Sequence, residues 1–359
     1  MRKYIAIMAA AAALAAPAQN TTKLSATKAN DYGIIYAIPT TVLDITIETE
    51  YTEKQPGEFY NYANLALSVK DGIIKPSQSA KVKSITIVPR GVANKENEWM
   101  MQFKGGQSVT VLLDDAGVPI AINTDDAALP KAPTLPVAKE AEPSPLETPA
   151  ARQAITQEMT LSSSMPKKAQ LAADRIFELR SQRNDLISGQ ADNTPPDGKA
   201  MQLALDNLAD QEAALMAMFV GTTKRWTEVN TITYTPDTTD VRDAVIARLS
   251  PVDGIVDASD LSGAPIYLTM KVLAKGEIEK DEKGNPKPFP KNGVAYQIPG
   301  SAQFTITYDG QQLASKQLEV SQLGVTYGLD PKLFTDKKFP SYVTFNPATG
   351  GITSFGTLE

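Results

Sequence analysis

The chain of 359 residues contains no cysteine and no histidine. Without cysteine, the protein has no disulfide, no thiol chemistry and no attachment point for the lipid of a lipoprotein. Without histidine, it lacks the usual general base, the Ser-His-Asp arrangement and the commonest zinc ligand. These absences argue against most classes of enzyme. No cofactor motif stands out in the sequence, so we expect no cofactor, no metal and no catalytic residues.

Positive charge is also scarce, because 35 Lys and Arg residues face 41 Asp and Glu residues, for a formal net charge of −6. An acidic chain without a basic stripe is a poor nucleic-acid binder, so we expect no nucleic acid among its partners. Long hydrophobic runs are missing as well. The apolar run from Ile5 to Ala15 is too short for a bilayer, and no other stretch approaches the required length. We therefore expect a chain that does not span a membrane.

The first 18 residues have the pattern of a secretory signal peptide. Arg2 and Lys3 form its basic start, the apolar run follows, and Ala16 to Ala18 provide a small-residue cleavage site. Cleavage there would leave Gln19 as the first residue. We expect a soluble, exported protein, located in the periplasm or at the cell surface and beyond, and not a lipoprotein.

Two β-patterned stretches, 19–128 and 223–359, flank a helical centre. Apolar and polar residues alternate from Leu43 to Tyr51, which predicts a strand of an antiparallel sheet with one wet face. In the second stretch, Val241 to Leu249 is interpreted as a short helix. The segment 129–163 is rich in proline and has few residues that could build a core, so it predicts a semi-extended linker.

The centre, 164–222, predicts two long helices that form an antiparallel hairpin. Apolar residues recur at steps of three and four from Ala169 to Leu186 and again from Met201 to Phe219. The charged residues of the first helix are mostly basic and those of the second mostly acidic, which favours pairing of the two helices. A polar turn with two prolines separates them.

Apolar residues are unevenly distributed along this hairpin. The stretch from Leu215 to Val220 is apolar on all sides, whereas the stretch from Arg180 to Lys199 is polar. We expect the base of the hairpin to be buried and its tip to project. The hairpin is then either a structural spacer or a carrier of a partner-binding tip, for which the candidate residues are Gln190, Asp192 and Asn193.

A sequence repeat relates the two β-patterned stretches. The segment from Gly33 to Pro39 recurs from Gly293 to Pro299 with a shared Tyr-x-Ile-Pro ending. Later in each half, the stretch from Val109 to Val118 resembles the stretch from Val343 to Ile352. The sequence therefore predicts an α+β fold with two related antiparallel β-units, sandwich or barrel-like, and an inserted helical hairpin. It leaves open whether the two units pack together.

The densest acidic cluster is a candidate metal site by composition, with Asp114, Asp115, Asp125 and Asp126. It lacks the spacing that a calcium-binding loop requires. We interpret it as ordinary turn chemistry, with a β-hairpin that returns through Val118 to Ile122.

Several motifs resemble one family along nearly the whole mature chain. Besides the two Tyr-x-Ile-Pro starts, they are Arg175–Arg180, Asp192–Gly198, Met218–Thr223, Arg248–Tyr267, Gln322–Val325 and Phe345–Gly350. They are similar to an uncharacterised family of exported proteins of Bacteroidales, a domain of unknown function of about 350 residues. The resemblance implies compartment and lineage, and it carries over no catalytic residue.

Three hypotheses of function remain. The leading one is a non-enzymatic envelope protein that binds or scaffolds a partner, a protein in the first place and a glycan in the second. A carboxylate-type glycan hydrolase needs no histidine, only two carboxylates about 5–5.5 Å or 6.5–9.5 Å apart. No such pair stands out, although Glu48 and Glu50 share one face of a strand. A carbohydrate-binding module would use exposed aromatic residues such as Trp99 or Trp226, which are otherwise expected in the core. The oligomeric state stays open.

Overall fold

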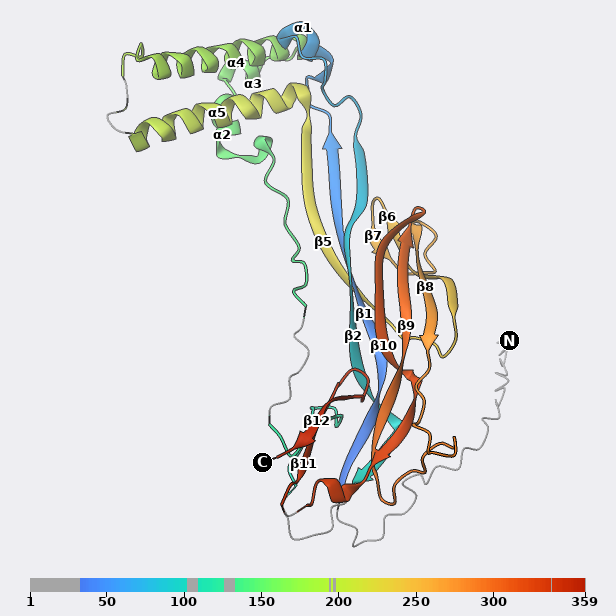
Figure 1. Ribbon diagram of the computed structural model, residues 1–359. Helices are drawn as coiled ribbons and strands as arrows, with labels where there is room; N and C mark the ends of the chain where they lie inside the picture. Colours follow the sequence, from blue (N-terminus) through green and yellow to red (C-terminus); the bar gives the residue numbers. More distant parts are fainter. Residues whose placement is uncertain are drawn as a thin grey trace, which may run out of the picture.

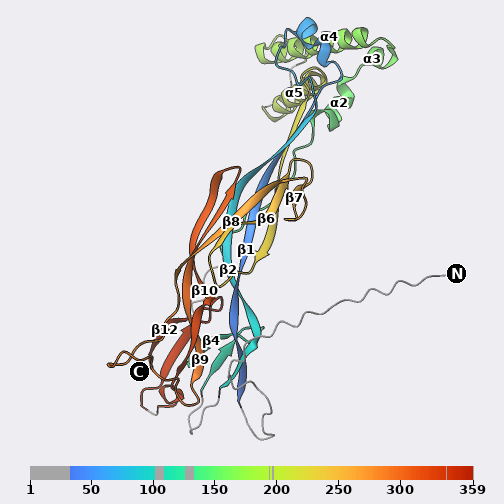
Figure 2. The same ribbon diagram turned by 90° about the vertical axis from the view of Figure 1, so that its right-hand side faces the viewer.

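The computed structural model describes residues 33–101, 109–125, 133–193, 195, 198–336 and 338–358. The predicted signal peptide, 1–18, lies outside these residues. The protein is an elongated α+β structure in which long antiparallel strands carry a helical head at one end, as Figures 1 and 2 show. The predicted fold class, with antiparallel β-units and a helical hairpin, is confirmed.

Three antiparallel sheets build the body. The first has the order β2-β1-β5, with β1 (Ile34–Gln55), β2 (Ser77–Met101) and β5 (Thr222–Tyr234). The second has the order β10-β9-β8-β6-β7, with β6 (Val241–Ser250), β7 (Gly254–Val256), β8 (Ala264–Ala274), β9 (Val294–Tyr308) and β10 (Gln311–Leu329). The third has the order β12-β11-β4-β3, with β3 (Val111–Leu113), β4 (Pro119–Ile122), β11 (Ser341–Phe345) and β12 (Ile352–Thr357).

The first two sheets pack face to face as a sandwich. Leu43, Ile45 and Ile47 of β1 belong to one buried cluster with Phe304 and Ile306 of β9. A second cluster lies at the end of the body away from the head, where residues of β1 and β9 meet the third sheet. That sheet itself joins both halves of the chain, because β4 pairs with β11. The two β-units therefore pack together and share their cores.

The sequence repeat is visible as repeated geometry. Each copy begins with two long paired strands, β1 with β2 and β9 with β10, and ends in a short hairpin, β3–β4 and β11–β12. The N–H of Ala37 donates to the carbonyl of Gly117, and the N–H of the equivalent Gln297 donates to the carbonyl of Gly350, both at 3.0 Å. Each long strand is therefore fastened to the short hairpin of its own copy.

The same irregularity also interrupts both long pairs. Ala37–Pro39 of β1 lie opposite Ala93–Glu98 of β2, and Ile298–Gly300 of β9 lie opposite Val320–Val325 of β10. Both shifts occur at the repeated proline, which cannot donate a hydrogen bond to a neighbouring strand. The pair β1–β2 and the pair β9–β10 thus share the same irregularity at equivalent positions, which confirms the duplication.

The head is built from three segments, of which the second and third follow one another directly in the chain. The first holds the short helices η1 (Tyr60–Tyr62) and α1 (Ala63–Leu67) between β1 and β2. The second holds η2 (Pro145–Glu147), α2 (Pro149–Ala154) and α3 (Gln157–Leu161). The third is the hairpin of α4 (Met165–Ser188) and α5 (Gly198–Val220). In the described part of the chain, no helix combines the length and the apolar character needed to cross a membrane.

Two expectations about local structure are wrong. Val241 to Leu249 is not a helix but most of β6, which pairs with β7 and β8. The segment 129–163, expected to be a semi-extended linker with few core residues, forms η2, α2 and α3 in its second half and contributes Ala154 and Met159 to the buried core of the head. In both places pairing or packing with distant residues outweighs the local signal.

The wet face predicted for β1 is also partly buried. Glu48 is only 7 % exposed. Its carboxylate accepts hydrogen bonds from Lys83 Nζ at 2.7 Å and Ser84 Oγ at 2.8 Å. The hydrogen bond from Lys83 is the main reason why the pKa of Glu48 lies below its ordinary value. The buried carboxylate is stabilised by its partners, as a buried charge requires.

Candidate functional site

The hairpin base, where α4 and α5 join the body, is buried as predicted. Leu215 is 1 % exposed and Phe219 is fully buried. Phe219 packs against Phe59 with ring centroids 5.4 Å apart. Backbone hydrogen bonds then fasten the first head segment to the end of α5, from Phe59 N to Met218 O at 2.7 Å and from Ile73 N to Val220 O at 2.8 Å. The base is therefore a fixed anchor.

An ionic cluster lies between this base and the tip. Arg180 Nε donates to Glu212 Oε1 at 2.6 Å, and Arg183 Nη1 donates to Glu212 Oε2 at 2.7 Å. The side chain of Glu212 is 14 % exposed, whereas those of the two arginines are 38 % and 35 % exposed. The prediction that basic residues of the first helix pair with acidic residues of the second is confirmed. Both arginines are thereby paired with Glu212, between the base of the hairpin and its outer half.

Beyond this cluster the two helices bury none of their described residues. The buried residues of α4 end at Leu179, and those of α5 begin at Gln211. Yet this outer half carries large apolar side chains, among which Leu203 is 72 % exposed and Ile187 is 66 % exposed. The described part of the chain leaves these two side chains largely exposed, and exposed apolar surface of this kind is typical of interaction sites.

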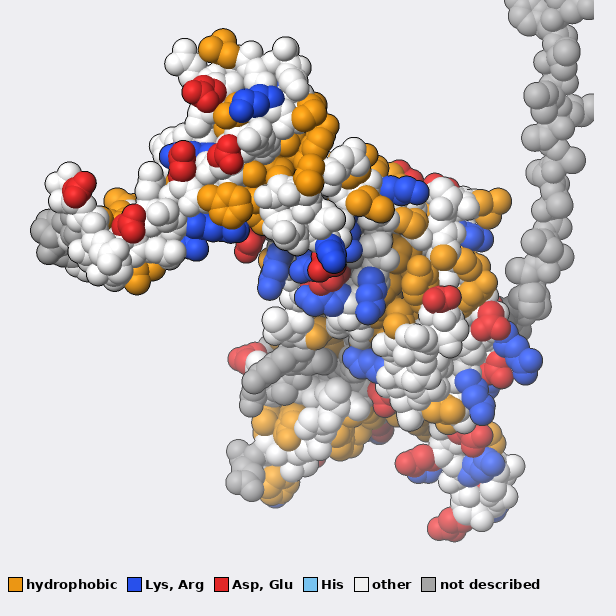
Figure 3. Space-filling model, turned by 90° about the horizontal axis from the view of Figure 1, so that it is seen from above, with side chains coloured by type: hydrophobic (Ala, Val, Ile, Leu, Met, Phe, Trp, Pro, Cys, Tyr) orange, Lys and Arg blue, Asp and Glu red, His pale blue; other side chains and the backbone are white. Residues whose placement is uncertain are grey.

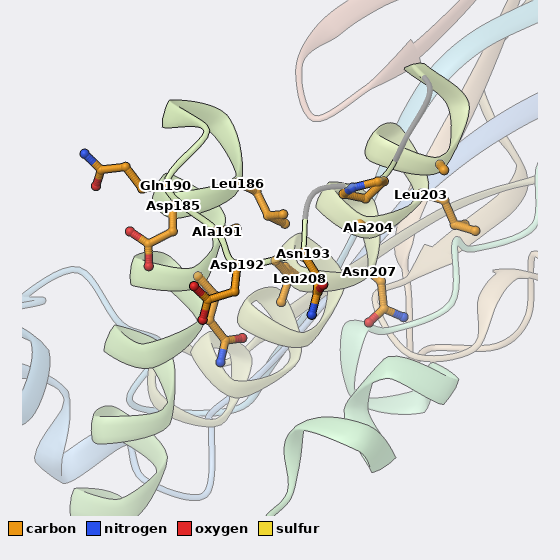
Figure 4. Close-up of a pocket in the computed structure, with 13 residues that line it drawn as sticks. Asp185, Leu186, Gln190, Ala191, Asp192, Asn193, Leu203, Ala204, Asn207 and Leu208 are labelled. Atoms are coloured by element: carbon orange, nitrogen blue, oxygen red, sulfur yellow. The ribbon is translucent and has the colours of Figure 1, made fainter.

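The outer half encloses a groove, hereafter the tip groove, with a volume of about 770 Å³. Figure 4 shows side chains of α4, α5 and the connecting turn around the same hollow. Its lining residues are Gln182, Asp185, Leu186, Gln190, Ala191, Asp192, Asn193, Pro195, Ala200, Leu203, Ala204, Asn207 and Leu208. The lining thus combines apolar side chains with amides and two carboxylates.

The three predicted tip residues Gln190, Asp192 and Asn193 all line this groove and are exposed. Gly189 ends α4 with a φ of 71°. Gln190 N then donates to Asp185 O at 2.8 Å. This left-handed cap turns the chain sharply and sets the three side chains at the mouth of the groove. Whether they bind a partner stays a prediction.

The apolar lining of the groove on α5 was not predicted from the sequence. The predicted seam of the second helix runs from Met201 to Phe219, whereas Leu203 and Ala204 line the groove together with Leu208. A second stripe was present in the sequence, because Ala200, Leu203, Ala204, Asn207 and Leu208 also recur at steps of three and four. Periodicity alone does not tell which of two stripes meets the partner helix.

A second concavity of about 430 Å³ lies on the β1–β5 face below the head. Its lining includes Glu50, Glu140, Glu142 and Trp226, together with Lys83, Lys139 and Arg225. Acids near an aromatic ring are the combination that a glycan-active site requires. All three glutamates are exposed to solvent, however. This cavity is the site to which the enzymatic alternative would have to be assigned.

Both tryptophans are half-buried, and each has one face covered. Trp226 stacks on Tyr51 at 5.1 Å, and Trp99 stacks on Phe289 at 5.6 Å. Their ring N–H groups donate to Glu228 Oε1 and Asn97 Oδ1. Each tryptophan is therefore partly a packing residue, and neither is the fully exposed platform that a carbohydrate-binding module favours.

The acidic cluster behaves as turn chemistry where the structure describes it. Asp114 Oδ1 accepts hydrogen bonds from Ala116 N at 2.9 Å and Val118 N at 2.8 Å, which closes the β3–β4 turn. Asp126 lies outside the described residues. Across those residues, no three acidic side chains come together as a metal site would need.

Comparison with known proteins yields one match. Residues 32–353 match DUF4831, a domain of unknown function. No curated protein and no solved structure matches the chain. The resemblance to an uncharacterised domain family of about 350 residues is thereby confirmed, while its lineage and its export remain predictions. Because the match covers most of its length, the chain belongs to the DUF4831 family.

Proposed function

We propose that this protein is a non-enzymatic binding or scaffolding protein of the cell envelope that holds a protein partner in its tip groove. The observation that carries the proposal is the outer half of the α4–α5 hairpin, which has no buried residue in its described part and an open groove of about 770 Å³. Exposed apolar surface rimmed by polar groups is typical of interaction sites.

The architecture supports the same proposal. The base of the hairpin is anchored by the head core, and the outer half extends away from the long axis of the body (Figure 1). A groove on a rigid element keeps its shape, so less order is lost on binding. Export is proposed from the basic start, the apolar run and the small residues of 1–18.

Site-specific photocrosslinking in the native envelope tests the proposal. The photoreactive residue p-benzoylphenylalanine replaces Leu203 in the groove or, as the control, Leu65 on α1, which is 87 % exposed. We expect a discrete adduct from position 203 and none of the same mass from position 65. Serine at positions 190, 192 and 193 should weaken that adduct. An adduct that forms equally at both positions, or none at position 203, would contradict the proposal.

The enzymatic alternative is favoured by one observation, the three glutamates beside Trp226 in the cavity on the β1–β5 face. It predicts that the protein hydrolyses a glycan and that Glu50→Gln, Glu140→Gln or Glu142→Gln abolishes this activity. Any reproducible turnover lost in one of these variants would replace the proposed function. A carbohydrate-binding role at the same cavity would instead appear as glycan binding lost in Trp226→Ala without turnover.

A further inference from the structure

We propose that the tip groove receives an amphipathic helix of the partner whose apolar stripe is flanked by basic side chains. This inference rests on the proposed function and names the chemistry of the partner. The bound helix would lie beside α4 and α5 and complete a three-helix bundle. Laying the apolar face of a helix into a hydrophobic groove is a recurring mode of recognition.

The shape of the groove favours a helix. On α5 its lining runs from Ala200 to Leu208, which corresponds to about two and a half helical turns or ~13 Å. The small side chains of Ala200 and Ala204 lie one turn apart, and the larger side chains of Leu203 and Leu208 line the groove with them. Alternation of small and large side chains lets the ridges of another helix pack into the groove.

The charge of the lining favours a basic partner. The charged side chains that line the groove are Asp185 and Asp192, and both are acidic. The nearby arginines Arg180 and Arg183 are bonded to Glu212 at the inner end. In the view of Figure 3, acidic side chains lie towards the outer end of the hairpin, and basic side chains gather nearer the body. Complementary charges across an interface raise the association rate and set the specificity.

The same charges disfavour a second copy of this chain as the occupant. If two tip grooves met face to face, the Asp185 and Asp192 side chains of both copies would be brought together. Like charges at an interface are unfavourable, particularly when water is excluded. A four-helix association of two hairpins is the competing arrangement, and the experiment has to distinguish it from a bound partner helix.

The test titrates the full chain with labelled synthetic helices of about 15 residues. The first peptide has leucine at helical spacing flanked by lysine. The second replaces each lysine with glutamate, and the third is a permutation of the first without an amphipathic face. Fluorescence anisotropy measures affinity, and hydrogen exchange locates the binding site.

The variants are Leu203→Asp in the groove, Leu65→Asp on α1 as the matched control, and the charge reversal Asp185→Lys with Asp192→Lys. We expect the lysine peptide to slow hydrogen exchange in the outer half of the α4–α5 hairpin and to bind Leu65→Asp as tightly as it binds the unmodified chain. Leu203→Asp should lower the affinity for this peptide at least about tenfold, with an unchanged melting curve. The charge reversal should shift the preference to the glutamate peptide. Added salt should weaken the binding of the lysine peptide, because it screens the attraction between its lysines and the two aspartates.

Other results would overturn the inference in distinguishable ways. Binding in the groove without a charge preference, or equal binding of the permuted peptide, would refute the basic helix and leave the proposed function standing. A dimer that dissociates in Leu203→Asp and blocks the peptide would replace the partner helix with a second copy. No peptide binding, together with a position-203 adduct, would refute the helix alone. Loss of both signals would refute the proposed function as well.

Discussion

Replacing Phe219 with alanine should strongly destabilise the head, because its side chain is fully buried where three chain segments meet. It contacts Phe59 of the first segment, and the same cluster includes Met159 of the second and Ile176 of α4. Truncation of a buried phenylalanine costs about 3–5 kcal/mol through lost transfer energy and the cavity that remains. Total stability is usually only about 5–15 kcal/mol, so a large part of it would be lost.

The matched control is Leu203→Ala on the same helix. Leu203 is 72 % exposed, so its truncation should change the free energy of unfolding by less than about 0.5 kcal/mol. Calorimetry should show a transition lowered by about 4 °C or more for Phe219→Ala, because the unfolding entropy of about 2.1 cal/mol/K per residue gives a chain of this length a shift of about 1.4 °C per kcal/mol. Leu203→Ala should melt like the unmodified chain.

Hydrogen exchange adds a local readout. The amides of Phe59 and Ile73 donate to carbonyls of α5 next to Phe219, so Phe219→Ala should make both exchange faster. If Leu203→Ala melted early and Phe219→Ala melted normally, the assignment of the buried and projecting ends would be reversed. Early melting with unchanged protection of these two amides would show that Phe219 does not anchor the first head segment.

Four further predictions concern the tip, two ionisable groups and export. Stability should change by less than about 1 kcal/mol in a denaturant titration of the triple variant Gln190→Ser, Asp192→Ser and Asn193→Ser, because these side chains are exposed. Since Lys83 lowers the folded-state pKa of Glu48, this pair should stabilise the fold above the ordinary carboxyl pKa of 4.5 and stop doing so as the pH falls further. Glu48→Gln should therefore flatten the acid side of a stability–pH curve, and an unchanged curve would refute this. Burial raises the pKa of Tyr51 to about 12, and the nearby Glu228 carboxylate adds to this shift. Tyr51→Phe should thus reduce the loss of stability that begins above pH 10, where the unfolded chain ionises this tyrosine and the folded chain does not. Mass spectrometry of the periplasmic protein should find Gln19 as the first residue, and an intact Met1 in a membrane fraction would contradict cleavage.

Local sequence determined the elements whose signals are short-range. The α4–α5 hairpin follows from apolar steps of three and four, from the left-handed cap at Gly189 and from the opposite charges that meet at Glu212. The β3–β4 turn follows from Asp114, whose side chain accepts two backbone N–H groups. The repeated Tyr-x-Ile-Pro strand starts predicted the duplication, because the same local sequence makes the same strand and the same irregularity at proline.

Tertiary structure decided what depends on distant partners. Val241 to Leu249 has apolar residues compatible with a helix, but β8 offers a row of backbone partners, and β6 forms instead. Glu48 reads as a solvent-facing residue, yet Lys83 and Ser84 of the neighbouring strand enclose it. The tip groove shows the same division. The sequence placed Gln190, Asp192 and Asn193 at an exposed turn, whereas only the folded hairpin shows that Leu203 and Ala204 line the same groove, because two stripes at helical spacing run along α5.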